Sequence, residues 1–411
     1  MRVLLRSETL KSQDNHISIS GVLMKSSNSY SLKEILKRYL GRTGRLYFLL
    51  DFFRKYRFFG YRFYHVQQSF IYTSGVVKHG EVLDDELLVA IAASISDRLL
   101  IEPTSQWKVI WETRHSEIIK ILLSKNTEKL GHFLLNPLGN DLMYGFDNMA
   151  KSLDSRLRIE NMFSDEQTCD AFISLAEYLS CVRVSSPEAY VSVFPDKVSV
   201  EDIVDKIMYS TGILKSGLPP FPNPLVGERG LKTKHGIASY RVPLAIYQAK
   251  KVTDLGKNIC EIGAGLGRTG YYSVLMGAEK YTMVDIPISS LCQSHYMLQN
   301  FKREDVALGQ ESSVGKSIKI MGPEEFQKQG EKYDVVLNVD SFTEMGLDAA
   351  TIYLKQISQC TKYFLSINHE NNEFSIIELM ENFPEFNKVY RSRCWLRKGY
   401  VEELYINTRI S

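Results

Sequence analysis

A short apolar run, Asn258–Ile262, leads directly into a glycine-rich segment and then into a stretch with helical patterning. The segment reads EIGAGLG over residues 261–267. Glycines are needed there because the backbone must turn sharply and approach a ligand without a Cβ in the way. The next apolar run ends at Asp285, where a carboxylate can accept hydrogen bonds from two ribose hydroxyls. These features predict a ribose-containing cofactor in an α/β fold.

Two classes of cofactor fit this loop. The residues GLGRTG at 265–270 match the dinucleotide fingerprint G-x-G-x-x-G, which is a weak signal by itself. A carboxylate at the strand end, Glu261, suits the ammonium of S-adenosylmethionine (SAM), whereas it would repel a pyrophosphate. The dinucleotide match also begins beyond the end of the strand. The loop therefore favours SAM over a dinucleotide, and a loop that binds no ligand is the third alternative.

The chain downstream of residue 257 alternates apolar runs of strand length with helical windows. Such alternation is typical of a parallel sheet covered by helices on both faces. The end differs, because Asn387–Arg391 and Tyr400–Asn407 are strand-like runs with no helix between them. We therefore predict a class I methyltransferase fold, a Rossmann-like α/β sheet of seven strands with an antiparallel C-terminal hairpin.

The N-terminal half has mainly helical patterning, as in Asp84–Leu100, Ser116–Leu130 and Asp165–Val182. Four prolines within residues 219–224 then interrupt both helical and strand patterns. We expect a mainly α-helical N-terminal domain over residues 1–210, a linker and lid segment over 211–256, and a methyltransferase domain over 257–411.

The composition is that of an ordinary soluble protein, with 44% hydrophobic and 24% charged residues. A formal net charge of +2 gives no global attraction to nucleic acid, so we expect no nucleic-acid partner. The six cysteines are dispersed without a CxxC pair, which suits a reducing cytosol. The longest strongly apolar stretch, Leu87–Ile95, is about half of the ~20 residues needed to cross a bilayer. We expect a cytoplasmic protein.

Five segments of the C-terminal half together resemble the sugar O-methyltransferase family of bacteria. They are CEIGAGLGRTGYY, YTMVDIP, VVLNVDSFTEM, FLSINHE and CWLRKGYVEELY. The resemblance covers residues 219–409 and implies a class I fold, SAM as methyl donor and a sugar hydroxyl as acceptor, with a role in surface-glycan biosynthesis. Competing functions are methylation of another small molecule at oxygen or nitrogen, a non-catalytic subunit of a glycan-assembly complex, and a dinucleotide-dependent oxidoreductase.

Four polar residues follow the expected fourth and fifth strands, where this fold places the acceptor: Asp340, Glu344, His369 and Glu370. A sugar hydroxyl is a weak acid, so its methylation requires a general base or a metal. We expect His369 to be the base, with Asp340 orienting it or acting as the base itself. The alternatives are a histidine that only bonds a loop and an aspartate that caps a helix. Asp340, Glu344 and His369 can also bind a divalent ion such as Mg²⁺.

Further contacts are expected around the cofactor and acceptor. Ile286 would lie against the adenine, Met321 and Gly322 at its edge, and Asn338 near the methionine part of SAM. Tyr240 and Arg241 precede the first strand, in a segment that can fold over the substrate, although Arg241 also fits a surface position. The full set of expected cofactor contacts is Glu261, Gly263, Ala264, Gly265, Gly267, Asp285, Ile286, Met321, Gly322 and Asn338; the expected acceptor contacts are Tyr240, Arg241, His369 and Glu370.

Residues 37–72 interleave basic and aromatic side chains. This composition can serve a membrane surface or a glycolipid, which would make the protein peripheral at the inner membrane. The alternative is that the aromatic side chains form an N-terminal core with the basic ones facing solvent.

Overall fold

The computed structural model describes residues 70–72, 84–100, 106–135, 140–145, 158–184, 199–222 and 229–410. By packing, the chain divides into two compact units, Met1–Tyr61 and Arg62–Ser411, and every described residue belongs to the second. Of the basic aromatic segment 37–72, only Phe70–Tyr72 lies within the described residues, so its expected membrane contact stays a prediction. In the described ranges, no helix combines the length and the apolar character that crossing a bilayer requires.

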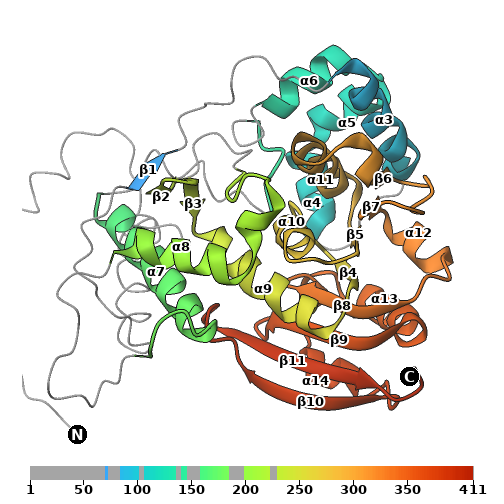
Figure 1. Cartoon of the computed structure of the whole chain (residues 1–411). Helices are drawn as coiled ribbons and strands as arrows, with labels where there is room; N and C mark the ends of the chain where they lie inside the picture. Colours follow the sequence, from blue (N-terminus) through green and yellow to red (C-terminus); the bar gives the residue numbers. More distant parts are fainter. Residues whose placement is uncertain are drawn as a thin grey trace, which may run out of the picture. The chain divides into compact units, whose positions relative to one another are not determined.

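The larger of the two sheets in the described ranges has eight strands in the order β10-β11-β9-β8-β4-β5-β7-β6 (Figure 1). Their bounds are β4 Asn258–Ile262, β5 Lys280–Val284, β6 Val306–Leu308, β7 Ile318–Met321, β8 Tyr333–Val339, β9 Thr361–His369, β10 Phe386–Arg393 and β11 Tyr400–Asn407. The strands from β6 to β9 pair in parallel, and β11 is antiparallel to both β9 and β10. The predicted α/β sheet with its C-terminal hairpin is confirmed, but the strand count is eight because the short β6 adds an edge strand.

Helices cover both faces of this sheet (Figure 1). On one face lie α9 Arg241–Leu255, α10 Arg268–Leu275 and α11 Pro287–Asn300, and on the other α12 Pro323–Lys328, α13 Leu347–Cys360 and α14 Ile376–Met380. Along β8, Val335 and Leu337 belong to the first core and Val336 to the second. This alternation is the two-residue period of a strand that is buried on both faces.

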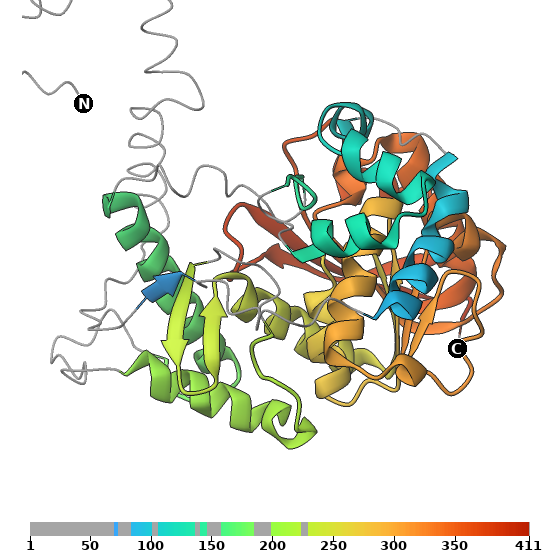
Figure 2. The same cartoon turned by 90° about the horizontal axis from the view of Figure 1, so that it is seen from above.

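The N-terminal half contributes further helices, which pack mainly on one another and on the helices of the first face. They are α3 Asp85–Ser96 with the 3-10 turn η2 Asp97–Leu100, α4 Gln106–Thr113, α5 Ser116–Leu123, α6 Thr127–Leu135, α7 Arg158–Tyr178 and α8 Val200–Ser210. The helix expected over 116–130 is divided, because Lys125 has a positive φ of 52°. Helix α3 packs on α11 (Figure 2), and its Leu88, Ile91 and Ile95 belong to the core of that face.

The segment expected to be a linker and lid has regular structure. It contains η4 Ile213–Ser216, the hairpin of β2 Arg229–Thr233 and β3 Gly236–Ser239, and α9. The hairpin pairs with β1 Phe70–Tyr72 in a separate three-stranded sheet, and His235 Nε2 lies 2.8 Å from Asp205 Oδ1 on α8. The expected division into domains at residues 210 and 257 stays a prediction. One cluster of buried hydrophobic residues contains side chains from both sides of these positions, from α3 to β11.

Candidate functional site

The glycine loop joins β4 to α10 and has a backbone that only glycine adopts easily. Gly263, Gly265 and Gly267 have φ of 75°, 58° and 90°, in the left-handed region. A Cβ on Gly263 would lie 2.2 Å from Ser341 Oγ. The loop thus presents bare backbone at the carboxyl end of β4, where ligands of open α/β sheets bind. Ala264 and Gly265 are partly exposed there.

Asp285 follows β5 and its carboxylate is bonded to this loop. Oδ2 accepts hydrogen bonds from Gly265 N at 2.9 Å and from Gln293 Nε2 at 3.0 Å, and Oδ1 accepts from Ile286 N at 2.8 Å. Burial raises the pKa of Asp285 to about 6, against the lowering effect of the backbone bonds from Ile286 and Gly265. Oδ2 already accepts two of these bonds, and Ser289 also bonds the carboxylate, so a ribose hydroxyl would bond at Oδ1 or take the place of one of the present donors. With that exchange, the loop and Asp285 fit the nucleoside of SAM.

Glu261 is more deeply buried than expected of a ligand-facing acid. Its side chain is 2% exposed, and Oε2 accepts a hydrogen bond from the Tyr281 hydroxyl at 2.7 Å. Burial raises the pKa of Glu261 to about 8, against the lowering effect of the Tyr281 bond. In the protein without bound SAM, the carboxyl group of Glu261 is therefore mostly protonated at pH 7. Its expected contact with the SAM ammonium stays a prediction.

The expected adenine neighbours lie at the ends of β5 and β7. Ile286 is partly exposed beside Asp285, whereas Met321 is buried in the core. Gly322 is covered by Arg98 of η2, because a Cβ there would lie 2.7 Å from Arg98 Cδ. Arg98 also donates to Ser290 Oγ on α11 at 3.4 Å. Arg98 and Gln293 were not expected from the sequence, since no local pattern links either residue to the strand ends.

Asn338 at the end of β8 is fully buried and joins three strands. Its Nδ2 donates to Ile262 O of β4 at 2.9 Å, and its Oδ1 accepts from Asn368 Nδ2 of β9 at 2.8 Å. Nδ2 also donates to Ser341 Oγ. The side chain thus fixes the strand ends around the glycine loop; its expected contact with SAM stays a prediction.

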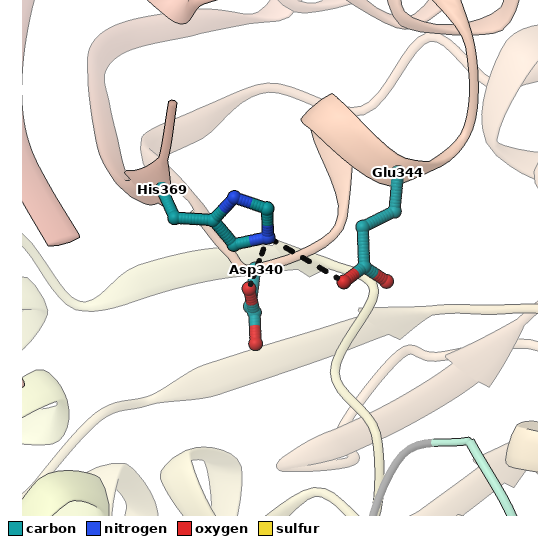
Figure 3. Close-up of side chains that lie close together, drawn as sticks. All are labelled: Asp340, Glu344 and His369. Carbon is teal, nitrogen blue, oxygen red and sulfur yellow. Dashed lines mark ion pairs between the residues drawn. The ribbon is translucent and has the colours of Figure 1, made fainter. Parts of the chain in front are cut away.

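Asp340, Glu344 and His369 lie together at the ends of β8 and β9 (Figure 3). His369 Nε2 is 3.6 Å from Asp340 Oδ1 and 3.8 Å from Glu344 Oε1 of the 3-10 turn η6 Phe342–Glu344. All three side chains are partly exposed. This grouping agrees with the expectation from the sequence, since parallel strands end at one edge of the sheet. We call these residues the acid–histidine cluster.

Two residues of the C-terminal hairpin contact Asp340 and were not expected. The Tyr400 hydroxyl donates to Asp340 Oδ1 at 2.9 Å, and Arg397 Nη2 donates to Oδ2. The Arg397 guanidinium carbon lies 3.8 Å from the centroid of the Tyr400 ring. Both residues belong to the C-terminal motif CWLRKGYVEELY, but one sequence gives no signal that this motif returns to β8.

The hydrogen bonding of His369 bears on its chemistry. Asn371 N donates to His369 Nδ1 at 3.3 Å, so a neutral imidazole carries its proton on Nε2, which faces both carboxylates. Nε2 can take a proton or bind a metal only when Nδ1 carries the proton instead. The Arg397 cation bonded to Asp340 also opposes a metal ion. The residues present thus fit proton transfer better than metal binding.

The other residues expected to contact the acceptor are Glu370, Tyr240 and Arg241. Glu370 accepts from Arg391 Nη2 of β10 at 2.8 Å. Tyr240 is 44% exposed, and the Arg241 guanidinium carbon lies 5.0 Å from its ring centroid. Their roles in binding an acceptor stay predictions.

No family model and no curated protein matches the chain, so membership of the sugar O-methyltransferase family is not confirmed. Solved structures are similar to part of it. A magnesium protoporphyrin IX methyltransferase from Synechocystis PCC 6803 with bound SAM is 14% identical over 40% of this chain and 76% of that chain, with a TM-score of 0.29. A ribosomal protein L11 methylase from Lactobacillus delbrueckii subsp. bulgaricus is 11% identical over 42% and 80%, with a TM-score of 0.30. A methyltransferase from Streptomyces caelestis is 13% identical over 40% and 89%, with a TM-score of 0.30.

At such identities these likenesses concern the fold alone. The assignment rests instead on the sheet, in which a parallel set of strands ends with the antiparallel β11 inserted between β9 and β10. The chain has the class I, Rossmann-like methyltransferase fold.

Proposed function

We propose that this protein is a SAM-dependent methyltransferase that methylates a hydroxyl group of a sugar. The observation that carries the donor assignment is the bond between Gly265 N and Asp285 Oδ2. This bond supports the proposal because it holds bare glycine backbone next to a carboxylate, at the carboxyl ends of β4 and β5. Bound SAM supplies a methyl group already activated by its sulfonium.

The residues of the chain then have separate tasks. Asp285 accepts hydrogen bonds from the ribose, and Ile286 packs against the adenine. The protein must chiefly align the acceptor hydroxyl and remove its proton. Either Glu344 or His369, whose side chains lie 3.8 Å apart, receives that proton. His369 accepts it at Nε2 once its own proton is on Nδ1 and the bond from Asn371 N is lost. Asp340, held by Arg397 and Tyr400, orients the imidazole.

Two features support a sugar as the acceptor. The segments from CEIGAGLGRTGYY to CWLRKGYVEELY resemble sugar O-methyltransferases. The acid–histidine cluster provides the base that a weakly acidic hydroxyl needs. The expected setting is surface-glycan biosynthesis in the cytoplasm, and the acceptor is a free or carrier-linked sugar.

Titration calorimetry with SAM and with NAD tests the donor. We expect SAM to bind, NAD not to bind, and Gly265→Arg to abolish SAM binding, because the new side chain fills the space over the loop. Gly315→Arg is the matched control, since Gly315 also has a positive φ of 72° but nothing within 4 Å of a Cβ. NAD binding without SAM binding would establish the oxidoreductase instead.

Incubation with labelled SAM and either nucleotide sugars or bacterial glycan extracts tests the acceptor. Label in a sugar hydroxyl supports the proposal. Label only in other small molecules, at oxygen or nitrogen, would replace the acceptor class. SAM binding with no transfer to any of them would indicate a non-catalytic subunit of a glycan-assembly complex.

A further inference from the structure

Two large aromatic side chains lie exposed next to each other in the described part of the chain. Trp395 belongs to the loop between β10 and β11 and is 37% exposed, and Tyr178 ends α7 and is 41% exposed. Their ring centroids are 5.4 Å apart and the planes are inclined by 32°. Both residues are usually more deeply buried, so this pair presents an uncommon aromatic surface.

The pair rests on a rigid base. Tyr247 of α9 is 2% exposed and meets both rings edge-on, at 5.1 Å from Tyr178 and 5.0 Å from Trp395. Its hydroxyl donates to Glu402 Oε2 at 2.5 Å. Glu402 Oε1 is bonded in turn by the Tyr390 hydroxyl at 2.6 Å and lies 3.0 Å from Lys251 Nζ. Charge-assisted bonds therefore hold the supporting ring, and ordering the platform costs little on binding.

The same loop carries the residues that hold the acid–histidine cluster. Cys394 N donates to Tyr400 O at 2.9 Å, which closes the loop around Trp395. Arg397 and Tyr400, from that loop and its closing strand, both bond Asp340. Trp395 is thus part of the short segment that reaches the candidate reacting centre.

We infer that Trp395 and Tyr178 form a stacking surface for a pyranose ring of the acceptor, outside the hydroxyl that is methylated. The faces of aromatic rings carry negative potential, and they attract the weakly positive C–H groups on the face of a sugar. Sites for small ligands combine such apolar surface with a few polar groups, and the hydroxyl of Tyr178 is a polar group of this kind. This inference rests on the proposed function and specifies the acceptor class.

Fluorescence of Trp395 tests the inference without methyl transfer. The chain has three tryptophans, so the double variant Trp107→Phe/Trp111→Phe leaves Trp395 as the sole tryptophan, which can be excited selectively over the tyrosines. We expect a saturable change in its emission with methyl α-glucopyranoside, methyl α-rhamnopyranoside or UDP-glucose, and none with glycerol. No saturable change with any pyranoside, or a change with phenol alone, would overturn the inference. Calorimetry with SAM is independent, so a failed donor assignment and a failed sugar surface are distinguishable.

Saturation-transfer NMR on the methyl pyranosides then tests the individual residues. Trp395→Leu and Tyr178→Leu should each weaken pyranoside binding about 5- to 10-fold, the range for loss of one aromatic contact, and Trp395→Phe should retain most of it. Tyr209→Leu is the matched control, because Tyr209 is 77% exposed on α8. Melting temperatures show whether each variant folds. Equal binding by folded Trp395→Leu and Tyr209→Leu proteins contradicts the inference.

Discussion

Arg397 and Asp340 are 57 residues apart in the chain and form an ion pair that joins the C-terminal hairpin to the end of β8. Asp340 has a φ of 58°, which residues other than glycine rarely adopt. Such backbone strain persists where surrounding contacts enforce it, and it clusters at functional sites. The hairpin therefore holds the Asp340 carboxylate in one orientation beside His369.

Replacing Arg397 tests whether this orientation matters for methyl transfer. Arg397→Gln should lower kcat by up to about 100-fold, the effect of a misplaced catalytic group, and should leave the Kd for SAM within about twofold. Kinetics with saturating SAM and calorimetry measure the two quantities. Arg393→Gln is the control, because Arg393 is an exposed arginine of the same hairpin. Equal losses in both variants would contradict a specific role for the ion pair.

A variant of the acid–histidine cluster, together with EDTA treatment, distinguishes base catalysis from metal catalysis. His369→Ala should reduce turnover by about 100-fold or more, in the range for a lost general base, while SAM affinity stays nearly unchanged. EDTA should have no effect on the wild-type rate. If EDTA abolishes activity and His369→Ala retains it, a divalent ion such as Mg²⁺ replaces the base. Glu344→Gln then shows which of the two acceptors takes the proton.

Asp285 should make SAM binding depend on pH. Its pKa is raised to about 6 by burial, so the carboxylate gains a proton as the pH falls through 6 and loses acceptor capacity for the ribose. The affinity for SAM should therefore fall up to about tenfold for each pH unit below 6 and be constant above 7. Asp285→Asn should bind SAM weakly with little dependence on pH. Calorimetry between pH 5 and 8 measures this, and a flat wild-type profile would exclude the role.

Glu261 should make the stability of the free protein depend on pH. Its pKa is 4.5 ordinarily and about 8 when folded. Below pH 4.5 both states are protonated; between 4.5 and 8 only the unfolded state loses the proton, so the native state loses stability as the pH rises. Glu261→Gln lacks this titration and keeps an acceptor for Tyr281. Its advantage in Tm should grow from pH 4.5 to 8.

Glu324→Gln provides the comparison, because Glu324 is an exposed acid on α12. It should show no such growth across the same range. A Glu261→Gln advantage that is constant with pH would mean that the effect comes from packing and not from ionisation.

The sequence predicted the architecture well where the pattern is local. The bounds of β4 and β11 agree with the expected runs Asn258–Ile262 and Tyr400–Asn407, because apolar and β-branched residues of strand length are a local signal. The grouping of Asp340 and His369 followed from the rule that parallel strands end at one edge. The three-residue β6 was missed since it is too short to show a period, and Lys125 interrupted a helix without a glycine or proline to mark it.

The environment of the site was less predictable. Arg98, Arg397 and Tyr400 reach it from segments that are remote in the chain, and a single sequence does not indicate such pairings. Gln293 lies only eight residues after Asp285, but no pattern in the sequence indicates that its side chain bonds that carboxylate. The burial of Glu261 could not be predicted either, because a strand-end acid has the same pattern whether it faces a ligand or lies beneath Tyr281.

The packing of α3 on α11 has a consequence for how the protein can be divided experimentally. Leu88, Ile91 and Ile95 are at most 1% exposed and share a core with Leu291 of α11. A fragment that begins at residue 211 would leave that apolar surface open to water, which is unfavourable by about 25 cal/mol for each Å². Such a fragment is expected to aggregate, and α3 and the sheet are expected to unfold together in one cooperative transition.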